Sequence, residues 1–309
     1  MCLETTPHAH AHGPRDDIAA TDDRPATDAA AMEARHDRLD RRGFLRRAAV
    51  AGAGAALVGA VPLTAASAAP AAPAASRAAL RSRPRMRDLT HVFRAGGPVY
   101  TFSSPARETL VTIQNDGFYA QQWTFAEHSG THLDAPGHFV VGNRLADELP
   151  PDELVAPIVV IDISARAATN PDAEVLPADL RAFERRHGRI PRNAIVAMYS
   201  GWETRIDNPT AYRNVGADGL FHFPGFGIDA VEWLLENRSI RAIGVDTLSL
   251  DNGPSQSFIV HVTVLGAERY GLENLRNLGT IPRRGATAFV GLVPWEEGSG
   301  GPARVIASW

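Results

Sequence analysis

Short runs of apolar, β-branched residues recur along the chain from Met86 onward. Because their valine and isoleucine content is nearly continuous, the runs are predicted to be strands with both faces buried. The six predicted strands cover residues 110–114, 158–163, 194–199, 242–245, 287–292 and 304–307. The pattern shows no repeat of the length found in solenoid proteins, so it does not indicate a repeat architecture.

Two segments between these strands have the periodicity of amphipathic helices. Residues 177–187 begin with a proline and are followed by Gly188, which are start and stop signals for a helix. Residues 228–237 place Val231 and Leu234 on one face. Strands alternating with helices predict one α/β domain over residues 86–309, in which helices pack against a mixed sheet.

The first 85 residues have a different composition. Residues 1–40 are polar and charged without apolar periodicity, which is typical of disorder. An arginine pair, an apolar run and a small-residue exit follow at Arg41-Arg42, residues 48–63 and Ala66-Ser67-Ala68. This order is similar to that of a twin-arginine signal peptide, and the apolar run is too short to span a membrane.

Residues 1–68 are therefore expected to be a disordered n-region with a signal peptide, and residues 69–85, rich in Ala, Pro and Arg, a linker. The cleavage position and the start codon, Met1 or Met32, stay open. This organisation predicts export by the twin-arginine translocase to the periplasm, the cell envelope or the outside of the cell.

Composition excludes several classes of function. The formal net charge is −4, from 31 basic and 35 acidic residues, which gives a nucleic-acid partner no electrostatic support. Every basic residue is an arginine, so a Schiff-base lysine is excluded. The single cysteine, Cys2, rules out an intramolecular disulfide and a cysteine-based zinc site.

Residues 127–139 hold the densest group of metal-ligating side chains. His128 and His132 are four residues apart, but Gly130 lies between them and favours a bend over a helix. In an extended segment, His132 and Asp134 point to the same side, and a bend at Gly130 brings His128 to the same place. Two imidazoles and one carboxylate suit catalytic Zn²⁺, with Mn²⁺ or Fe²⁺ as alternatives. Glu127, Ser129 and Thr131 are candidates to orient the rings.

The pattern His-x-Gly-Thr-His-x-Asp-x-Pro-x-His, from His128 to His138, resembles the cyclase family of metal-dependent hydrolases, which includes bacterial kynurenine formamidase and isatin hydrolase. Further resemblance lies in residues 88–91, 200–202 and 244–251, and the whole match covers roughly residues 87–293. The resemblance implies a swivelling β/β/α fold and a homodimer or homotetramer.

The same resemblance assigns roles to single residues. It implies that His128, His132 and Asp134 bind one ion and that Asp134 bridges to a second ion, which His261 and Glu273 also bind. The ion would be Zn²⁺ or Mn²⁺. The family commonly has paired histidines where His261 stands alone, so the resemblance is compatible with either one or two ions per subunit.

The remaining assignments concern proton transfer and the substrate. The resemblance implies that His138 carries protons, which suits an imidazole because it titrates near neutral pH. It places Tyr100 against the ring of the substrate, although a tyrosine packed in the core fits the sequence equally well.

These observations predict a metal-dependent amidohydrolase that uses metal-activated water to cleave a carbon–nitrogen bond in a small aromatic or cyclic amide. A lactone hydrolase or a polyketide-type cyclase with the same site is an alternative. A non-catalytic metal-binding protein of the envelope is another, although such a protein would not need a proton carrier at His138.

Overall fold

The computed structural model describes residues 84–100 and 103–309. The predicted signal peptide and nearly all of the predicted linker lie outside the described residues. Among the described residues, no helix has the length and apolar character needed to cross a membrane.

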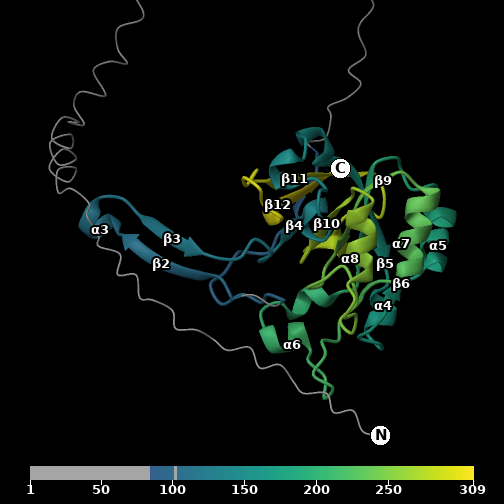
Figure 1. Ribbon diagram of the computed structural model, residues 1–309, viewed down its shortest axis with the longest axis horizontal. Coiled ribbons are helices and arrows are strands. Elements are labelled where there is room, and N and C mark those ends of the chain that lie inside the picture. Colours follow the sequence, from purple (N-terminus) through teal and green to yellow (C-terminus); the bar gives the residue numbers. More distant parts are fainter. Residues whose placement is uncertain (1–83, 101–102) are drawn as a thin grey trace, which may run out of the picture. The chain divides into compact units, whose positions relative to one another are not determined.

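The centre of the fold is a closed, seven-stranded mixed barrel (Figure 1). Its strands, in hydrogen-bonded order, are β12 (Gly300–Ser308), β11 (Ala286–Leu292), β5 (Val155–Asp162), β7 (Ala194–Tyr199), β9 (Ile240–Val245), β10 (Tyr270–Glu273) and β4 (His132–Asp134). Pairing of β4 with β12 closes the barrel, and β1 (Met86–Asp88) extends it at β12. The predicted mixed α/β class is confirmed, whereas the closure was not predicted.

Both faces of the parallel strands β5, β7, β9 and β10 are covered, which explains their continuous apolar runs. On β5, Ile158 and Val160 join one buried cluster with Leu133 and Leu272 from neighbouring strands. The alternate residues of β5 join a second cluster that contains residues of the packed helices. Successive side chains of a strand point to opposite faces, so one cluster fills the barrel and the other seals its outside.

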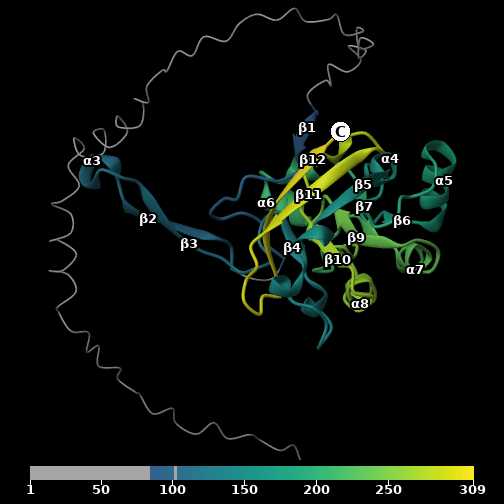
Figure 2. The same cartoon turned by 90° about the horizontal axis from the view of Figure 1, so that it is seen from above.

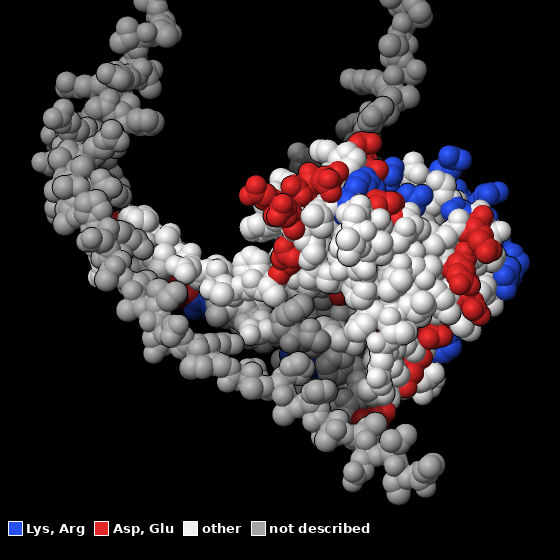
Figure 3. Space-filling view, viewed as in Figure 1, with Lys and Arg blue, Asp and Glu red and all other residues white. Residues whose placement is uncertain are grey.

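Three helices cover the outside of the parallel strands (Figures 1 and 2). They are α5 (Pro177–His187), α7 (Ile228–Asn237) and α8 (Ile259–Gly266). The first two have the predicted bounds, and α7 buries Val231 and Leu234 as predicted. Figure 3 shows acidic and basic side chains interspersed over the α5 side of the molecule, while the surface over α8 is nearly uncharged.

The predicted strand at residues 110–114 is wrong in both bounds and in its burial. Strand β2 (Ala106–Val111) pairs with β3 (Ala120–Thr124) in a hairpin; β2 is largely exposed, and β3 has both partly buried and exposed residues. The chain leaves β2 because Thr112 caps a short helix, α3 (Ile113–Asp116), by accepting the Asn115 N–H. The remaining α-helices and strands of the described residues are α4 (Ser164–Ala167), α6 (Pro209–Arg213) and the two-stranded ribbon of β6 (Glu174–Val175) and β8 (Gly225–Phe226).

Candidate metal centre and active-site cavity

The cluster at His128, His132 and Asp134 has the predicted local geometry. His132 and Asp134 lie on the extended strand β4, and the intervening side chain belongs to the barrel interior. Gly130 has a φ of +65°, and a Cβ there would lie 2.9 Å from the Phe93 ring. The predicted bend is therefore confirmed, and it needs glycine for both its backbone conformation and its close packing.

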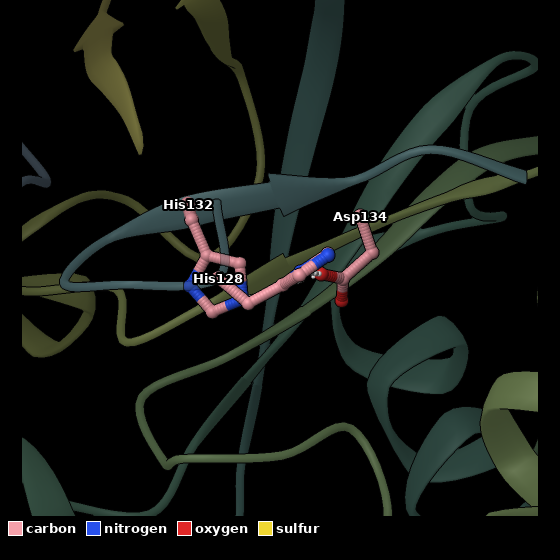
Figure 4. A group of neighbouring side chains, drawn as sticks. All are labelled: His128, His132 and Asp134. Carbon is pink, nitrogen blue, oxygen red and sulfur yellow. Dashed lines mark hydrogen bonds and ion pairs between the residues drawn. The ribbon is translucent and has the colours of Figure 1, made fainter. Parts of the chain in front are cut away.

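The three side chains point toward one another (Figure 4). His128 Nδ1 lies 2.6 Å from one carboxylate oxygen of Asp134, and His132 Nε2 lies 3.2 Å from the same oxygen. His132 and Asp134 are buried, while His128 is partly buried.

His261 and Glu273 join this cluster from distant parts of the sequence. Strands β10 and β4 pair antiparallel with Glu273 opposite His132, and the two side chains approach to 3.2 Å. Helix α8 brings His261 Nε2 to 3.0 Å from Glu273 and 3.7 Å from Asp134. Asp134 thus belongs to two groups of potential ligands, one with the first two histidines and one with His261 and Glu273.

Each histidine of the cluster uses its second ring nitrogen to contact an orienting partner. His132 Nδ1 lies 2.9 Å from the Gly130 carbonyl oxygen, and His261 Nδ1 lies 2.7 Å from Asp251. His128 Nε2 lies 2.9 Å from the hydroxyl of Ser299, which in turn contacts Glu127. Such partners fix the tautomer and angle of a metal-ligating ring.

Sequence reasoning found these orienting partners only in part. Glu127 acts through Ser299, which has no local signal in the sequence. Asp251 stands at the end of a segment already noted for its resemblance, but its partner His261 is ten residues further on. Thr131 instead donates to the Asn274 carbonyl oxygen, and Ser129 contacts no ring.

Neighbouring charges outweigh burial in setting the pKa values of His132, His261 and Asp134. Burial lowers the pKa of His132, but the Asp134 and Glu273 carboxylates outweigh it and raise that pKa well above its ordinary value. Burial likewise opposes the carboxylates around His261, which raise its pKa to about 10. Burial raises the pKa of Asp134, but its histidine neighbours outweigh it and hold the pKa well below its usual range. The carboxylates thus favour bound positive charge.

Two atoms of the cluster lack the hydrogen bonds that burial normally demands. His132 Nε2 and one oxygen of Asp134 are buried, and neither has a hydrogen-bond partner despite their close neighbours. An unpaired imidazole nitrogen and an unpaired carboxylate oxygen, beside further imidazoles and a carboxylate, match the donor set that divalent cations take in catalytic sites. The residues present therefore fit the predicted metal.

His138 lies beside the cluster and contacts it through its ring face. It ends a short 3-10 helix (Pro136–His138), and its ring stacks on that of His128 with centroids 3.8 Å apart. Burial lowers the pKa of His138 to about 4, because the neighbouring charges only partly offset it. A neutral imidazole in this position can accept a proton.

The cluster opens into a cavity of about 250 Å³, the size of a small ligand. Its walls include His138, Tyr100, Phe139, Phe258 and Ser249. Burial, followed by the negative charge of nearby carboxylates, raises the pKa of Tyr100, so its hydroxyl stays protonated. A larger cavity of about 470 Å³ lies beside residues 91–98, but none of the five clustered ligands lines it. The smaller cavity is the better candidate for the active site because all five residues of the cluster line it.

Comparison with known proteins agrees with this site. The family model described as “Putative cyclase” matches residues 87–252. The chain is 35% identical over 204 residues to isatin hydrolase from Roseibium aggregatum, covering 62% of this chain and 76% of that protein. It is 26% identical over 194 residues to kynurenine formamidase from Bordetella avium, covering 57% and 82%.

A solved structure gives the same picture for the fold. Isatin hydrolase A from Labrenzia aggregata, bound to benzyl benzoate, superposes with a TM-score of 0.69 at 34% identity. The match covers 73% of this chain and 93% of that one. The predicted resemblance is confirmed, and the chain belongs to the cyclase family of metal-dependent hydrolases.

Proposed function

We propose that the protein is a metal-dependent amidohydrolase that cleaves a carbon–nitrogen bond in a small cyclic or aromatic amide with metal-activated water. The observation that carries the proposal is the buried His/Asp/Glu cluster, whose histidines are each oriented and which opens into a cavity with aromatic walls. Membership of the family that contains isatin hydrolase supports a cyclic amide as the substrate, since isatin is one.

In this proposal, His128, His132 and Asp134 bind one divalent ion, and Asp134, His261 and Glu273 provide a site for a second. The ion is Zn²⁺ or Mn²⁺. When bound, such an ion acidifies water and polarises a carbonyl group. The protein orients the rings through Asp251, Ser299 and the carbonyl oxygen of residue 130, so the ligands need little rearrangement to bind.

His138 is the proton carrier in this proposal. Its ring lines the cavity next to the cluster, and burial lowers the pKa of His138 to about 4, so the ring is neutral and can accept a proton. It can take a proton from the attacking water and deliver it to the nitrogen that leaves. Tyr100 and Phe139 form the cavity wall against which the substrate ring would pack.

The test is metal analysis of the full chain combined with a substrate screen. We expect the purified protein to contain Zn²⁺ or Mn²⁺ and to lose activity after chelation. Adding back either Zn²⁺ or Mn²⁺ should restore the activity. The screen compares isatin, N-formyl aromatic amines and lactones. Preference for a lactone would favour the alternative hydrolase, and metal binding without turnover of any compound would favour the non-catalytic alternative. A protein that neither binds metal nor turns over any of them would contradict the proposal.

The proposal also includes a fold type, an export route and an oligomeric state. The parallel and antiparallel halves of the barrel, with helices outside, support the swivelling β/β/α fold type. The arginine pair supports export through the twin-arginine translocase, with the domain boundaries given above. Replacing Arg41 and Arg42 by lysine should keep the protein in the cytoplasm of a bacterial host, and unchanged export would contradict this route. The proposed assembly is a homodimer or a homotetramer.

A further inference from the structure

Phe258 has a backbone conformation that is unusual for a bulky side chain. Its φ of 49° and ψ of 38° lie in the left-handed region, immediately before helix α8. The other non-glycine residues with positive φ in the described part of the chain are asparagines and glutamates, at positions 193, 214, 268, 274, 277 and 297. Asparagine tolerates this region well, whereas an aromatic residue there is strained.

The start of helix α8 does not explain this strain. An N-cap residue normally accepts a backbone N–H with its side chain, which phenylalanine cannot do. The Asp251 carboxylate accepts instead from the N–H groups of Val260 and His261, at 3.0 and 3.1 Å. The helix is therefore capped from another segment, and residue 258 could be glycine without loss of a capping bond.

The Phe258 ring, in contrast, has a defined place in the active-site cavity. Its centroid lies 5.5 Å from that of Tyr100 at an interplanar angle of 66°, and 5.6 Å from that of Phe139. It also lies 5.8 Å from the ring of His261. The three aromatic side chains come from separate segments, and Phe258 is the one in contact with both others. Without its ring, this wall of the cavity would be discontinuous.

We propose that Phe258 is a specificity-determining residue, whose strained backbone holds an aromatic wall against a planar, conjugated ring of the substrate. The inference rests on the proposed amide hydrolysis and assigns recognition of the aromatic ring to this one side chain. Aromatic pairs in edge-to-face or offset geometry gain energy beyond the area they bury, so a saturated ring of equal size binds less well. The backbone strain is tolerated because the ring is needed there.

The test uses glycine and alanine at this position, because only glycine relieves the backbone. We expect Phe258→Gly to melt about 3 °C above Phe258→Ala, from the strain typical of a left-handed residue. Both variants should lose about tenfold in the preference for formanilide over N-formylcyclohexylamine, measured as the ratio of kcat/KM. Using a ratio cancels the intrinsic reactivity of the two substrates.

Glu297 provides the matched control. It also has a positive φ, of 53°, but it is exposed and does not line the cavity. Glu297→Gly should likewise melt above Glu297→Ala, while neither variant changes the preference for the aromatic substrate. This comparison separates relief of the backbone from removal of the ring.

Anthranilate binding to the full chain, measured by calorimetry with and without added metal, distinguishes failure of the inference from failure of the proposed function. If no amide is hydrolysed but both Phe258 variants bind anthranilate about tenfold more weakly, the aromatic wall stands and the amidohydrolase proposal fails. If Phe258→Gly melts no higher than Phe258→Ala, the claim of strain is overturned. If the variants keep the wild-type substrate preference and anthranilate affinity, the claim of specificity is overturned.

Discussion

The carboxylate of Asp251 connects two functions, the start of helix α8 and the orientation of the His261 ring. It is buried, and it accepts from two backbone N–H groups and from His261 Nδ1. We predict that Asp251→Asn weakens metal binding about 10–100-fold, because an amide presents only one acceptor oxygen to these donors. Competition with a chelator of known affinity measures the change.

Asp172 is a suitable control for this prediction, since it also binds a histidine, His222 at 2.9 Å, but lies outside the cluster. Asp172→Asn should leave the affinity for metal unchanged. Equal affinity in the wild type and Asp251→Asn would show that the ring of His261 does not depend on its partner.

His138 should behave in the opposite way from the ligands. Replacing it by alanine removes a group that stacks on His128 but offers no atom to either group of potential ligands. We predict that His138→Ala keeps the full metal content and loses about 10²–10⁴-fold in kcat, the usual contribution of a general acid–base residue. Metal content by mass spectrometry and kcat must be measured on the same sample. Unchanged turnover, or loss of the metal, would contradict the assignment.

At the scale of single residues, the sequence predicted the convergence of the candidate ligands better than the residues that orient them. His128, His132 and Asp134 are close in sequence, so strand periodicity and one glycine were enough to bring them together. Ser299 could not be found this way, because it reaches His128 only when β12 pairs with β4. Phe258 gave no sequence signal either, since a positive φ depends on what surrounds the residue.

Among the elements, those with a strong periodic pattern were predicted to the residue. Strand β7 and helices α5 and α7 have the expected bounds. Helix α8 was missed because its sequence, Ile-Val-His-Val-Thr-Val-Leu-Gly, is β-branched and apolar on all sides. Strand β4, with only three residues, was expected as an extended segment, but its place in the barrel was not predicted. The elements that carry the site were thus the hardest to predict, since tertiary contacts decide their structure.

An ion pair between Glu184 of α5 and Arg238 after α7 links the ends of two outer helices. Both side chains are mostly buried, and Arg238 Nε donates to Glu184 at 2.6 Å. This hydrogen bond holds the pKa of the Glu184 carboxyl below its ordinary value, although burial opposes it. We predict that Glu184→Gln lowers the free energy of unfolding by about 2 kcal/mol at pH 7, measured with urea.

The stabilisation by the Glu184–Arg238 pair should depend on pH. Because the pKa is lower in the folded protein, the stabilisation is fully present above the unfolded value of about 4.3 and is lost as the pH falls through the folded value. The difference between wild type and Glu184→Gln should therefore shrink in acid. Glu232→Gln, at an exposed position of α7, should change little at any pH. A difference that stays constant down to pH 3 would mean that the charge of Glu184 does not contribute.

At the scale of the whole molecule, the β2–β3 hairpin carries apolar side chains that the fold of one chain leaves exposed. It extends away from the barrel (Figures 1 and 2), and Leu110, Ile113, Phe118 and Tyr119 are each more than half exposed. A two-stranded hairpin alone is only marginally stable in water, and exposed apolar groups of this kind mark interfaces. The homo-oligomer expected from the family resemblance offers a cover for it, with each hairpin packed on a second copy across a twofold axis.

We predict that Leu110→Glu combined with Phe118→Glu converts the oligomer to monomers, because two carboxylates in an apolar contact carry a high desolvation cost. Light scattering at several protein concentrations measures the mass. Leu176→Glu, at an exposed apolar position just before helix α5, should leave the mass unchanged. Since the cluster and its orienting partners all lie in one chain, the monomer should still bind metal. A wild-type monomer, or an oligomer that survives both hairpin substitutions, would exclude the hairpin as the contact between copies.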